Sequence, residues 1–523
     1  MEFSRTTFLL SLVLVLGLSS SSSHPNNDFL QCLTDQFRYS NSSTDVIITP
    51  TNASSYASLL ESQNLRPEST SPLKPLLIVT PYLVSQIQAS IYCSKKLGTE
   101  IRVRSGGHDY EGLSYTSRNP FIIVDMRNLR SVTIDNEAKT AWVETGSTLG
   151  QLYYALEKNN KTLTFPAGVC PTVGVGGHFS GGGYGMLSRK HGLASDHIID
   201  AKLINADGKV LDRGSMGEDL FWALRGGGSA SFGIILEFKV SLVVVPETVT
   251  GFIVTRTSEQ DAARLVDKWQ HVADKVDEDL LLRASGNMTR TIVATFNALY
   301  LGRANELLPL MEREFPELGL AGKDCIEMSW IESVLFFASL RNQSLDVLES
   351  RTPQKPFSPS YYKGKSDFVS TPIPINGLPG IWRFLHEEEE NMGALEFSPF
   401  GGRLSNFSES ESPFPHRAGN MFMIRYGVVW EKEGNKELQR HYDWIRRLYS
   451  YMARYVTKSP RAAYFNYKDL DIGMIRQGNT SYSQASVWGP KYFKNNYDRL
   501  VRVKAKADPS NFFKNEQSIP VSH

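Results

Sequence analysis

The chain has 523 residues, of which 41% are hydrophobic and 21% are charged. These proportions are typical of a folded protein with two or three domains, and they exclude a chain that is mostly disordered. The 56 Lys and Arg residues nearly balance the 55 Asp and Glu residues, which leaves a net charge of +1. So small a charge gives no reason to expect nucleic acid or an anionic membrane surface as a partner.

The N-terminus has the pattern of a secretory signal peptide. Arg5 precedes a mainly apolar run from Phe8 to Leu18, and a run of serines follows. This apolar run is too short to span a bilayer, which takes about 20 apolar residues. We therefore assign residues 1–23 to a signal peptide and residues 24–64 to an N-terminal segment, and we expect a secreted protein without a membrane-spanning helix.

Secretion also decides how the cysteines are interpreted. The chain has four cysteines, Cys32, Cys93, Cys170 and Cys325. In an oxidising compartment, four thiols can form disulfides in three complete pairings. Several Asn-x-Ser/Thr triplets agree with the same route. They begin at Asn41, Asn52, Asn160, Asn287, Asn342, Asn406 and Asn479.

Up to about residue 245, short apolar runs alternate with a helical pattern, which predicts an α+β domain. The proline-rich segment 62–81 is expected to be a loop. A helix is expected over residues 149–156. Strands are expected over 101–104, 121–125, 141–144, 198–204 and 234–245.

A second region, residues 246–462, mixes further strands and helices. Strands are expected over 248–255, 291–300 and 422–429. Helices are expected over 259–276 and 438–455, and proline-rich loops over 352–359 and 372–379. The final residues, 463–523, are rich in Tyr, Asn and Lys and have little core of their own. We expect them to pack back onto an earlier part of the chain.

Three glycine-rich stretches indicate that the backbone lies close to a planar or charged ligand. Residues 104–112 read RSGGHDYEG, residues 168–185 read GVCPTVGVGGHFSGGGYG, and residues 226–228 are all glycine. Glycine permits close backbone approach, and paired glycines can cradle an anion with backbone N–H groups. None of the stretches matches a Walker loop or the G-x-G-x-x-G fingerprint of a Rossmann unit. A nucleotide would therefore be bound in some other way.

Together with further motifs near the C-terminus, these stretches give the chain a specific resemblance. The segments that carry it are 104–112, 170–185, FNYKDLD at 465–471, DPSNFF at 508–513 and NEQSIP at 515–520. The chain resembles the plant berberine bridge enzyme-like flavoproteins, part of the vanillyl-alcohol oxidase superfamily with its PCMH-type FAD-binding domain.

The resemblance implies a two-lobed α+β fold. Residues 65–245 are expected to form the PCMH-type FAD-binding domain. Residues 246–462 are expected to form a substrate-binding domain, an antiparallel sheet backed by helices. Residues 463–523 are expected to form a C-terminal segment that packs on the FAD domain.

The same resemblance implies FAD attached at two points, with His108 on the flavin 8α-methyl group and Cys170 on flavin C6. An imidazole nitrogen and a thiolate are nucleophiles able to add to the electron-poor flavin ring. The other cofactor-binding residues that it implies are Ser105, Gly106, Gly107, Asp109, Val173, Gly174, Gly177, His178, Gly183, Gly185, Gly233, Ile235 and Asn466. It also implies a disulfide between Cys32 and Cys93, which leaves Cys325 as a buried free thiol.

A metal site is the other interpretation of some of these histidines. The candidates are His178, His191 and His197, but their spacing fits no standard zinc pattern and no second cysteine lies near them. We therefore expect no metal.

On the substrate side, the resemblance implies that Tyr467 faces the flavin, with Tyr110 and Tyr184 as further active-site tyrosines. A base must take the proton of the substrate hydroxyl. A free phenol has a pKa of about 10, so a nearby cation is needed to favour the phenolate at neutral pH. Each tyrosine has the alternative role of a stacking wall without proton transfer.

The segment MFMIRY at 421–426 departs from relatives that resemble monolignol oxidases, which carry Lys at the position of Met423 and Gln at that of Arg425. A displacement of two residues along a strand keeps the same face. Arg425 is expected to favour the phenolate of Tyr467, to bind an anionic substrate group, or to form an ordinary ion pair with Asp or Glu. The glutamate base that alkaloid-bridging relatives place after Gly-Gly-Arg is Leu404 here, which disfavours alkaloid bridge formation.

The expected function is that of a secreted FAD-dependent oxidase of the apoplast or cell wall. It would oxidise a hydroxyl group to a carbonyl and pass the electrons to O2 to give hydrogen peroxide. The resemblance implies cell-wall oligosaccharides or monolignols as substrates, and the missing lysine favours saccharides. Val173 lies, by the resemblance, near flavin C4a, where a small side chain admits oxygen. The protein is expected to be a monomer without nucleic-acid or membrane partners.

Two alternative functions remain open from the sequence. One is an oxidative cyclase or pericyclic catalyst of phenolic or prenylated metabolites. The other is a wall-resident flavoprotein without catalytic activity.

Overall fold

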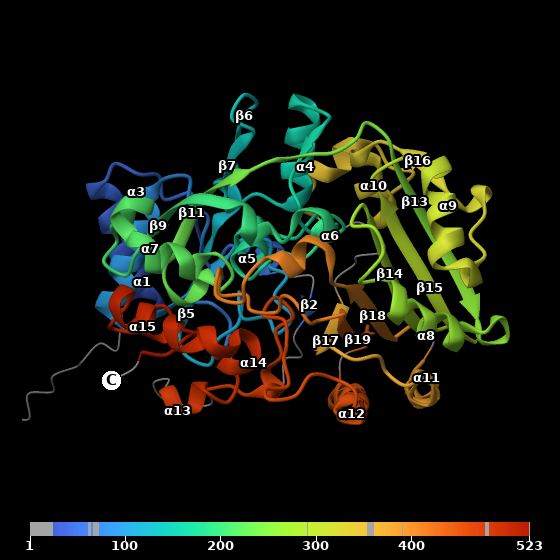
Figure 1. Cartoon of the computed structure of the whole chain (residues 1–523). Coiled ribbons are helices and arrows are strands. Elements are labelled where there is room, and N and C mark those ends of the chain that lie inside the picture. Colours follow the sequence, from blue (N-terminus) through green and yellow to red (C-terminus); the bar gives the residue numbers. More distant parts are fainter. Residues whose placement is uncertain are drawn as a thin grey trace, which may run out of the picture.

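The computed structural model describes residues 25–60, 64–65, 73–289, 291–352, 360–389, 391–432, 434–475 and 481–521 (Figure 1). The assigned signal peptide, the sequon at Asn479 and most of the expected loop over 352–359 lie outside these residues. Helices and sheets occur together throughout the described chain, which confirms the α+β class.

The N-terminal part combines a small sheet with three helices, two of which are joined by a disulfide. The strand order is β1 (Ile47–Ile48), β3 (Ile78–Val79), β5 (Phe121–Asp125) and β4 (Glu100–Arg104). The helices are α1 (Pro25–Tyr39), α2 (Ala53–Leu60) and α3 (Val84–Leu97). Phe29, Leu33 and Phe37 recur at four-residue spacing and are fully buried, so one face of α1 packs into the core. Cys32 in α1 bonds to Cys93 in α3, which confirms the expected pair.

A second, five-stranded sheet follows. Its order is β10 (Val210–Leu211), β9 (Ile198–Ile204), β11 (Ile234–Ser241), β7 (Thr140–Glu144) and β6 (Val132–Asp135). The helices of this part are α4 (Leu149–Asn159), α5 (Val175–Ser180), α6 (Ser188–His191) and α7 (Arg213–Leu224). The single strand expected over 234–245 was wrong. After Ser241 the chain leaves this sheet, and β12 (Val243–Val244) pairs instead with β8 (Leu163–Thr164).

The third sheet has eight strands and occupies the right half of Figure 1. Its order is β16 (Ile326–Met328), β13 (Val249–Thr257), β15 (Ile292–Tyr300), β14 (Leu280–Met288), β18 (Gly393–Pro399), β19 (Phe422–Trp430), β17 (Ser360–Val369) and β2 (Asn64–Leu65). All its neighbours are antiparallel except β17 and β2, which are parallel. The residues of β2 fall in the segment expected to be a loop, where this edge pairing supplies the hydrogen bonds.

Helices accompany this sheet. They are α8 (Ala262–Val272), α9 (Ala304–Glu314), α10 (Trp330–Phe337), α11 (Leu378–Glu387) and α12 (Asn435–Met452). Trp269 of α8 and Trp444 of α12 are buried in one core with the sheet residues. The helix expected from residue 259 begins only at Ala262, because Asp261 has a left-handed backbone (φ 59°) that ends the preceding 3-10 turn. The loop expected over 372–379 already contains the start of α11.

The C-terminal residues form three short helices at the lower edge of Figure 1, namely α13 (Tyr482–Ala485), α14 (Gly489–Phe493) and α15 (Tyr497–Ala507). Lys504 of α15 is fully buried and donates to the Asp508 carboxylate at 2.6 Å and to the Ser231 and Phe513 carbonyls at 2.7 and 2.8 Å. These bonds tie the end of the chain to the part that carries β11. None of the described helices combines the length and apolar character that crossing a bilayer requires.

Candidate active site

The two longer glycine-rich stretches meet backbone to backbone. A Cβ atom on Gly106 would lie 2.2 Å from the Gly174 nitrogen, and one on Gly174 would lie 2.1 Å from the Ser105 hydroxyl oxygen. That hydroxyl donates to the Thr145 carbonyl at 2.5 Å and accepts from the Gly176 N–H at 3.4 Å. Only glycine fits at the contact, so the sequence here is dictated by the close approach of two loops.

This contact brings His108 and Cys170 to the same place. His108 Nε2 lies 2.9 Å from the Thr172 hydroxyl oxygen, and Cys170 Sγ lies 3.8 Å from the same oxygen. Burial, reinforced by the Arg351 guanidinium, lowers the pKa of His108 to about 4, so its imidazole is neutral at physiological pH. Burial raises the pKa of the Cys170 thiol. Two nucleophilic side chains thus converge on one hydroxyl.

The surroundings of these side chains fit a planar cofactor. A Cβ atom on Gly177 would have no heavy atom within 4 Å, although its neighbour Gly176 is closely packed. Gly107 has a positive φ of 74°, which turns the loop just before His108. Open space beside close-packed glycines, with an imidazole and a thiol at hand, suits a flavin ring attached at two points.

The other residues expected to bind the cofactor mostly hold this framework together. His178 Nε2 accepts from the Gly168 N–H at 2.9 Å, and the His178 carbonyl accepts from Asn466 at 2.9 Å. Asp109 accepts from backbone N–H groups of its own loop, and burial raises its pKa. The Ile235 carbonyl accepts from the Thr145 hydroxyl at 2.6 Å.

Several glycines expected to bind the cofactor lie so close to neighbouring backbone that no side chain would fit. A Cβ atom on Gly185 would lie 1.7 Å from the Ala167 carbonyl oxygen, and one on Gly233 would lie 2.6 Å from the Ile204 carbonyl oxygen. The N–H of Gly183 donates to the Tyr464 hydroxyl at 2.8 Å.

Two of the three expected tyrosines stack directly on each other. The rings of Tyr110 and Tyr467 are parallel within 3°, with centroids 5.2 Å apart. Tyr362 of β17, which the sequence did not single out, meets Tyr110 edge-on at 4.7 Å. Tyr464 meets Tyr467 edge-on at 4.9 Å. We call Tyr110, Tyr362 and Tyr467 the tyrosine cluster.

Tyr184 is placed differently from the cluster. Its hydroxyl donates to the Pro399 carbonyl at 2.6 Å, and its ring stacks on Phe400 at 5.7 Å. The Arg283 guanidinium lies 5.4 Å from the centre of the same ring. The geometry therefore favours the stacking-wall role for Tyr184.

Arg425 reaches the tyrosine cluster as part of an ion pair. Its guanidinium lies 3.5 Å from the Tyr362 hydroxyl oxygen and 3.3 Å from the Glu396 carboxylate. Glu396 and Arg425 are direct neighbours on β18 and β19, so the strand register makes the pair. Of the three roles expected for Arg425, the structure contains the ion pair, and Met423 is buried in the core.

Two residues of this charged group were missed by sequence reasoning, namely Glu396 and Arg283. Burial works to raise the pKa of Glu396, but the guanidinium groups of Arg425 and Arg283 outweigh it and hold that pKa at about 2. Nε of Arg283 is buried and has no hydrogen-bond partner among the described residues. The group therefore carries one negative and two positive charges and keeps a spare donor.

The electrostatic surroundings of Tyr467 work in opposing directions. Burial raises its pKa, and the negative charge of Glu396 raises it further. The guanidinium groups of Arg425 and Arg283 act to lower it. Burial also raises the pKa of Tyr110 well above its ordinary value. At neutral pH both phenols are protonated in the chain alone, and the arginines favour the phenolate of Tyr467.

Val173 lies on the loop that carries Cys170, whereas Leu404 lies in the core. The Val173 N–H donates to the Cys170 carbonyl at 3.3 Å, so Val173 follows directly on the loop of the expected attachment residue. Leu404 is fully buried in the core next to Arg403, which itself is exposed.

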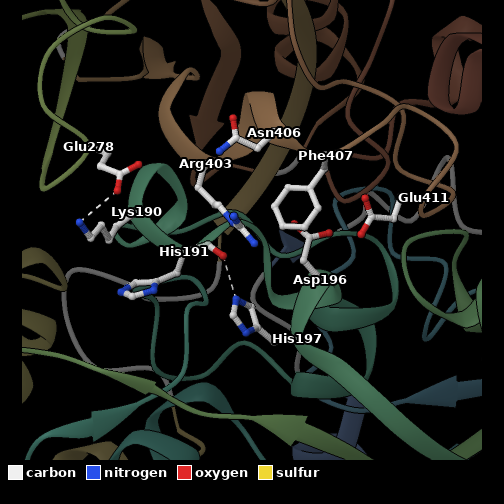
Figure 2. A pocket seen from close by; sticks show the side chains of 9 residues that line it. All are labelled: Lys190, His191, Asp196, His197, Glu278, Arg403, Asn406, Phe407 and Glu411. Carbon is white, nitrogen blue, oxygen red and sulfur yellow. Dashed lines mark hydrogen bonds and ion pairs between the residues drawn. The ribbon is translucent and has the colours of Figure 1, made fainter.

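A separate cavity of about 590 Å³ lies beside α6 (Figure 2). It is lined by Lys190, His191, Asp196, His197, Glu278, Arg403, Asn406, Phe407 and Glu411. The lining includes none of the residues of the glycine loops or of the tyrosine cluster. Within the part of the chain that the structure covers, no group of three or more His, Cys, Asp or Glu side chains is arranged to hold a metal ion.

Two family models match the parts of the chain that build this site. The model described as "FAD binding domain" matches residues 75–214, which include both glycine loops. The model described as "Berberine and berberine like" matches residues 463–520, which include Asn466 and Tyr467.

Known proteins match over nearly the whole chain. "Berberine bridge enzyme-like 18" of Arabidopsis thaliana is 49% identical over 522 residues, 99% of this chain and 96% of that protein. "Tetrahydroberberine oxidase" of Berberis wilsoniae is 50% identical over 526 residues, 98% of this chain and 97% of that protein.

Solved structures agree with these relatives. BBE-like #28 from Arabidopsis thaliana superposes with a TM-score of 0.88 at 47% identity, covering 95% of this chain and 100% of that one. Wild-type Phl p 4.0202, described as a glucose dehydrogenase, gives 0.88 at 43% identity, covering 94% and 99%. The chain is a member of the berberine bridge enzyme-like family of FAD-linked oxidoreductases.

Proposed function

We propose that this protein is a secreted oxidase that converts a substrate hydroxyl group to a carbonyl, with FAD attached to both His108 and Cys170. The observation that carries the proposal is the convergence of these two nucleophiles on Thr172 beside the open space at Gly177. When bound there, FAD would supply the hydride acceptor. A neutral imidazole is the form of His108 that can act as a nucleophile, and the lowered pKa keeps it neutral.

In this proposal Tyr467 takes the proton of the substrate hydroxyl. The ring of Tyr110 stacks on the ring of Tyr467 and fixes its orientation. A phenol of raised pKa is a strong base once it is deprotonated. Catalysis then also requires that enough of the phenolate forms near neutral pH. Arg425 and Arg283 serve this requirement, because both act to lower the pKa of Tyr467. Glu396 limits their effect and keeps the charged group from holding two uncompensated cations.

The polar wall next to the tyrosine cluster favours a saccharide over a monolignol. Arg283, Glu396 and Arg425 offer donors and acceptors to several hydroxyl groups, and tyrosine rings offer faces for a sugar ring. A monolignol has only an allylic alcohol, a phenol and an apolar body to match them. The net positive charge of the three side chains also disfavours a cationic amine. Relatives described as a glucose dehydrogenase and as glucose oxidase variants support a carbohydrate substrate.

The small side chain of Val173 supports oxygen as the electron acceptor. Among the relatives, wild-type Phl p 4.0202 is described as a glucose dehydrogenase, and the single isoleucine-to-valine variant of Phl p 4 as a glucose oxidase. A valine in place of isoleucine leaves more room, as oxygen access requires. We propose that Val173 plays this part here, with hydrogen peroxide as the product.

Secretion to the apoplast, a monomeric state and the domain boundaries at residues 65, 246 and 463 belong to the same proposal. The disulfide between Cys32 and Cys93 supports an oxidising compartment. Several sequon asparagines, such as Asn52, Asn342 and Asn406, are exposed, as attachment of a glycan requires.

The experiment that tests the proposal is anaerobic bleaching of the flavin absorbance in the purified secreted protein. Neutral oligosaccharides such as cellobiose, acidic oligosaccharides and coniferyl alcohol are compared side by side. We expect a saccharide to bleach the flavin fastest. The Tyr467→Phe variant is the control, since it keeps the ring stack and loses the proton acceptor. Bleaching by coniferyl alcohol alone would refute the saccharide assignment, and a flavin that no hydroxyl substrate reduces would refute the oxidase.

A further inference from the structure

We propose that a buried ionic cluster holds the tyrosine cluster in place, and that Lys363 is its central positioning residue. The ionic cluster consists of Glu111, Lys363, Lys365, Asp469 and Asp471. The inference rests on the proposed function for one of its readouts, the rate at which substrate bleaches the flavin. Its other readout does not depend on any substrate.

The contacts of the ionic cluster join three segments that are far apart in the sequence. Lys363 Nζ donates to the Glu111 carboxylate and, at 2.8 Å, to Oδ1 of Asp469. Lys365 Nζ lies 2.8 Å from Oδ2 of Asp469 and 2.8 Å from Oδ2 of Asp471. The first anion comes from the loop after β4, the cations come from β17, and the other two anions come from the C-terminal segment.

Four of the five members of the ionic cluster are buried, and Arg446 completes the balance of their charges. The side chains of Glu111, Lys363, Lys365 and Asp469 are each 2% exposed. Arg446 of α12 pairs with Asp471 at 2.7 and 2.9 Å, so three cations face three carboxylates. Burying ions costs several kcal/mol each, which mutual attraction roughly repays. The cluster therefore adds little net stability, and its distinctive property is fixed geometry.

Each of the three segments carries a tyrosine of the cluster next to its ion. Tyr110 directly precedes Glu111, Tyr362 directly precedes Lys363, and Tyr467 lies two residues before Asp469. On β17 successive side chains point to opposite faces of the sheet. Tyr362 lies on the face that Arg425 shares, and Lys363 lies on the other. The ions thus fix the backbones from one side of the strand while the rings meet on the other side.

Backbone N–H groups of the C-terminal segment add further hydrogen bonds to the ionic cluster and its surroundings. The Leu470 N–H donates to the Glu111 carboxylate at 3.0 Å, and the Asp469 N–H donates to the Tyr492 hydroxyl at 3.1 Å. The stacking distance between Tyr110 and Tyr467 is therefore set by partners of Lys363 on both sides. Removing Lys363 breaks the bridge between Glu111 and Asp469, although Lys365 still balances the charge of Asp469. The two segments then lose the contact that sets their spacing.

The test compares Lys363→Met with Lys504→Met in the full-length flavoprotein. Lys504 is equally buried and also pairs with a carboxylate, but its contacts join α15 to Ser231 and Phe513 and touch no active-site tyrosine. Three quantities are measured: the melting temperature, the near-ultraviolet circular dichroism of the aromatic rings, and the bleaching rate at saturating substrate. The double variant Lys363→Met/Glu111→Gln removes one cation together with one anion and protects the fold if the single variant does not fold.

We expect both single variants to lower the melting temperature, because each leaves a buried carboxylate without its cation. Only Lys363→Met should change the aromatic dichroism and reduce the bleaching rate, on the order of 10²-fold for a displacement of about 1 Å. The double variant should regain melting temperature without regaining the rate. Rates that follow melting temperature alone in all three variants would overturn the proposal.

Failure of the proposed function would look different. If no hydroxyl substrate bleaches the wild-type flavin, the aromatic dichroism still decides whether Lys363 positions the tyrosine rings. An unchanged dichroism in folded Lys363→Met or in the double variant would overturn the positioning role by itself.

Discussion

The ion pair between Glu396 and Arg425 leads to opposite expectations for two single substitutions. Glu396 raises the pKa of Tyr467, and Arg425 lowers it. If Tyr467 is the base, the bleaching rate rises with pH as its phenolate forms. Glu396→Gln removes the negative charge and should move this rise to lower pH. Arg425→Gln removes the positive charge and should move it to higher pH.

The strength of the ion pair follows from the pKa of Glu396. Its pKa is held at about 2, against an ordinary value of 4.5, despite burial that acts in the other direction. That difference corresponds to roughly 3 kcal/mol in favour of the charged carboxylate. Arg425 and Arg283 share this interaction, so we assign about half to Arg425. The displacement of either profile depends on the separate effect of each charge on the phenol of Tyr467. We take this effect as on the order of one pH unit, the low end of what a nearby charge produces.

The ion pair between Glu396 and Arg425 also leads to a prediction about thermal stability. The pKa of Glu396 in the folded chain lies below its unfolded value, so the pair stabilises the fold fully above about pH 4.5. This contribution is lost as the pH falls toward 2. The melting temperature of Arg425→Gln should therefore lie below that of the wild type at pH 7, and the gap should narrow below about pH 4.

The assay is stopped-flow anaerobic bleaching at saturating substrate across about pH 5 to 9. Arg425→Lys is the matched control, since it keeps the positive charge and should leave the profile nearly in place. Displacement of both glutamine variants in the same direction, or of neither, would refute the assignment of Tyr467 as a base tuned by this pair.

Three further outcomes are expected. Val173→Leu should slow reoxidation of the reduced flavin by oxygen and leave bleaching unchanged, and equal reoxidation rates would contradict oxygen access past this residue. Flavin should remain with the acid-precipitated protein in His108→Ala and in Cys170→Ala but not in the double variant, as fluorescence of the washed precipitate would show. Replacing Cys32 and Cys93 by serine should lower the melting temperature, since closing a loop with a separation of 61 residues is worth up to about 4 kcal/mol.

Runs of apolar residues made the first part of the fold predictable. Every residue of β5 is buried, and its sequence FIIVD is the kind of short apolar run that predicts an inner strand. β9 was likewise expected at the bounds that it has. The signal in these strands is local. β5 is buried throughout, and β9 has apolar residues on both sides of the partly buried Asp200 and Lys202.

Strand β17 shows why other parts of the fold could not be predicted from the sequence. Its sequence SYYKGKSDFV places Lys363, Lys365 and Asp367 on one face, which resembles a face exposed to solvent. All three are nevertheless buried, because their partners arrive from elsewhere in the chain. The partner of Lys363 on the C-terminal side, Asp469, is 106 residues away. No local pattern contains that information.

The residues of the candidate site also divide into those that the sequence could predict and those that it could not. His108, Cys170 and Tyr467 lie in long motifs, so resemblance could point to them one by one. Glu396 and Arg283 lie on β18 and β14, two strands that were not expected, and they become part of the site only through pairing with β19 and its neighbours. The ion pair of Arg425 could be anticipated as a type of contact, but its partner could not.

The C-terminal segment has a consequence for how this protein matures. Asn466 and Tyr467 complete the site, and the Asn466 amide ties their segment to the His178 carbonyl at 2.9 Å. The glycine loops are synthesised far earlier and can fold first, as N-terminal parts of a nascent chain generally do. The tyrosine stack, in contrast, cannot form until Tyr467 has been synthesised. A product that ends before residue 463 would therefore contain the glycine loops and lack both Asn466 and the tyrosine stack.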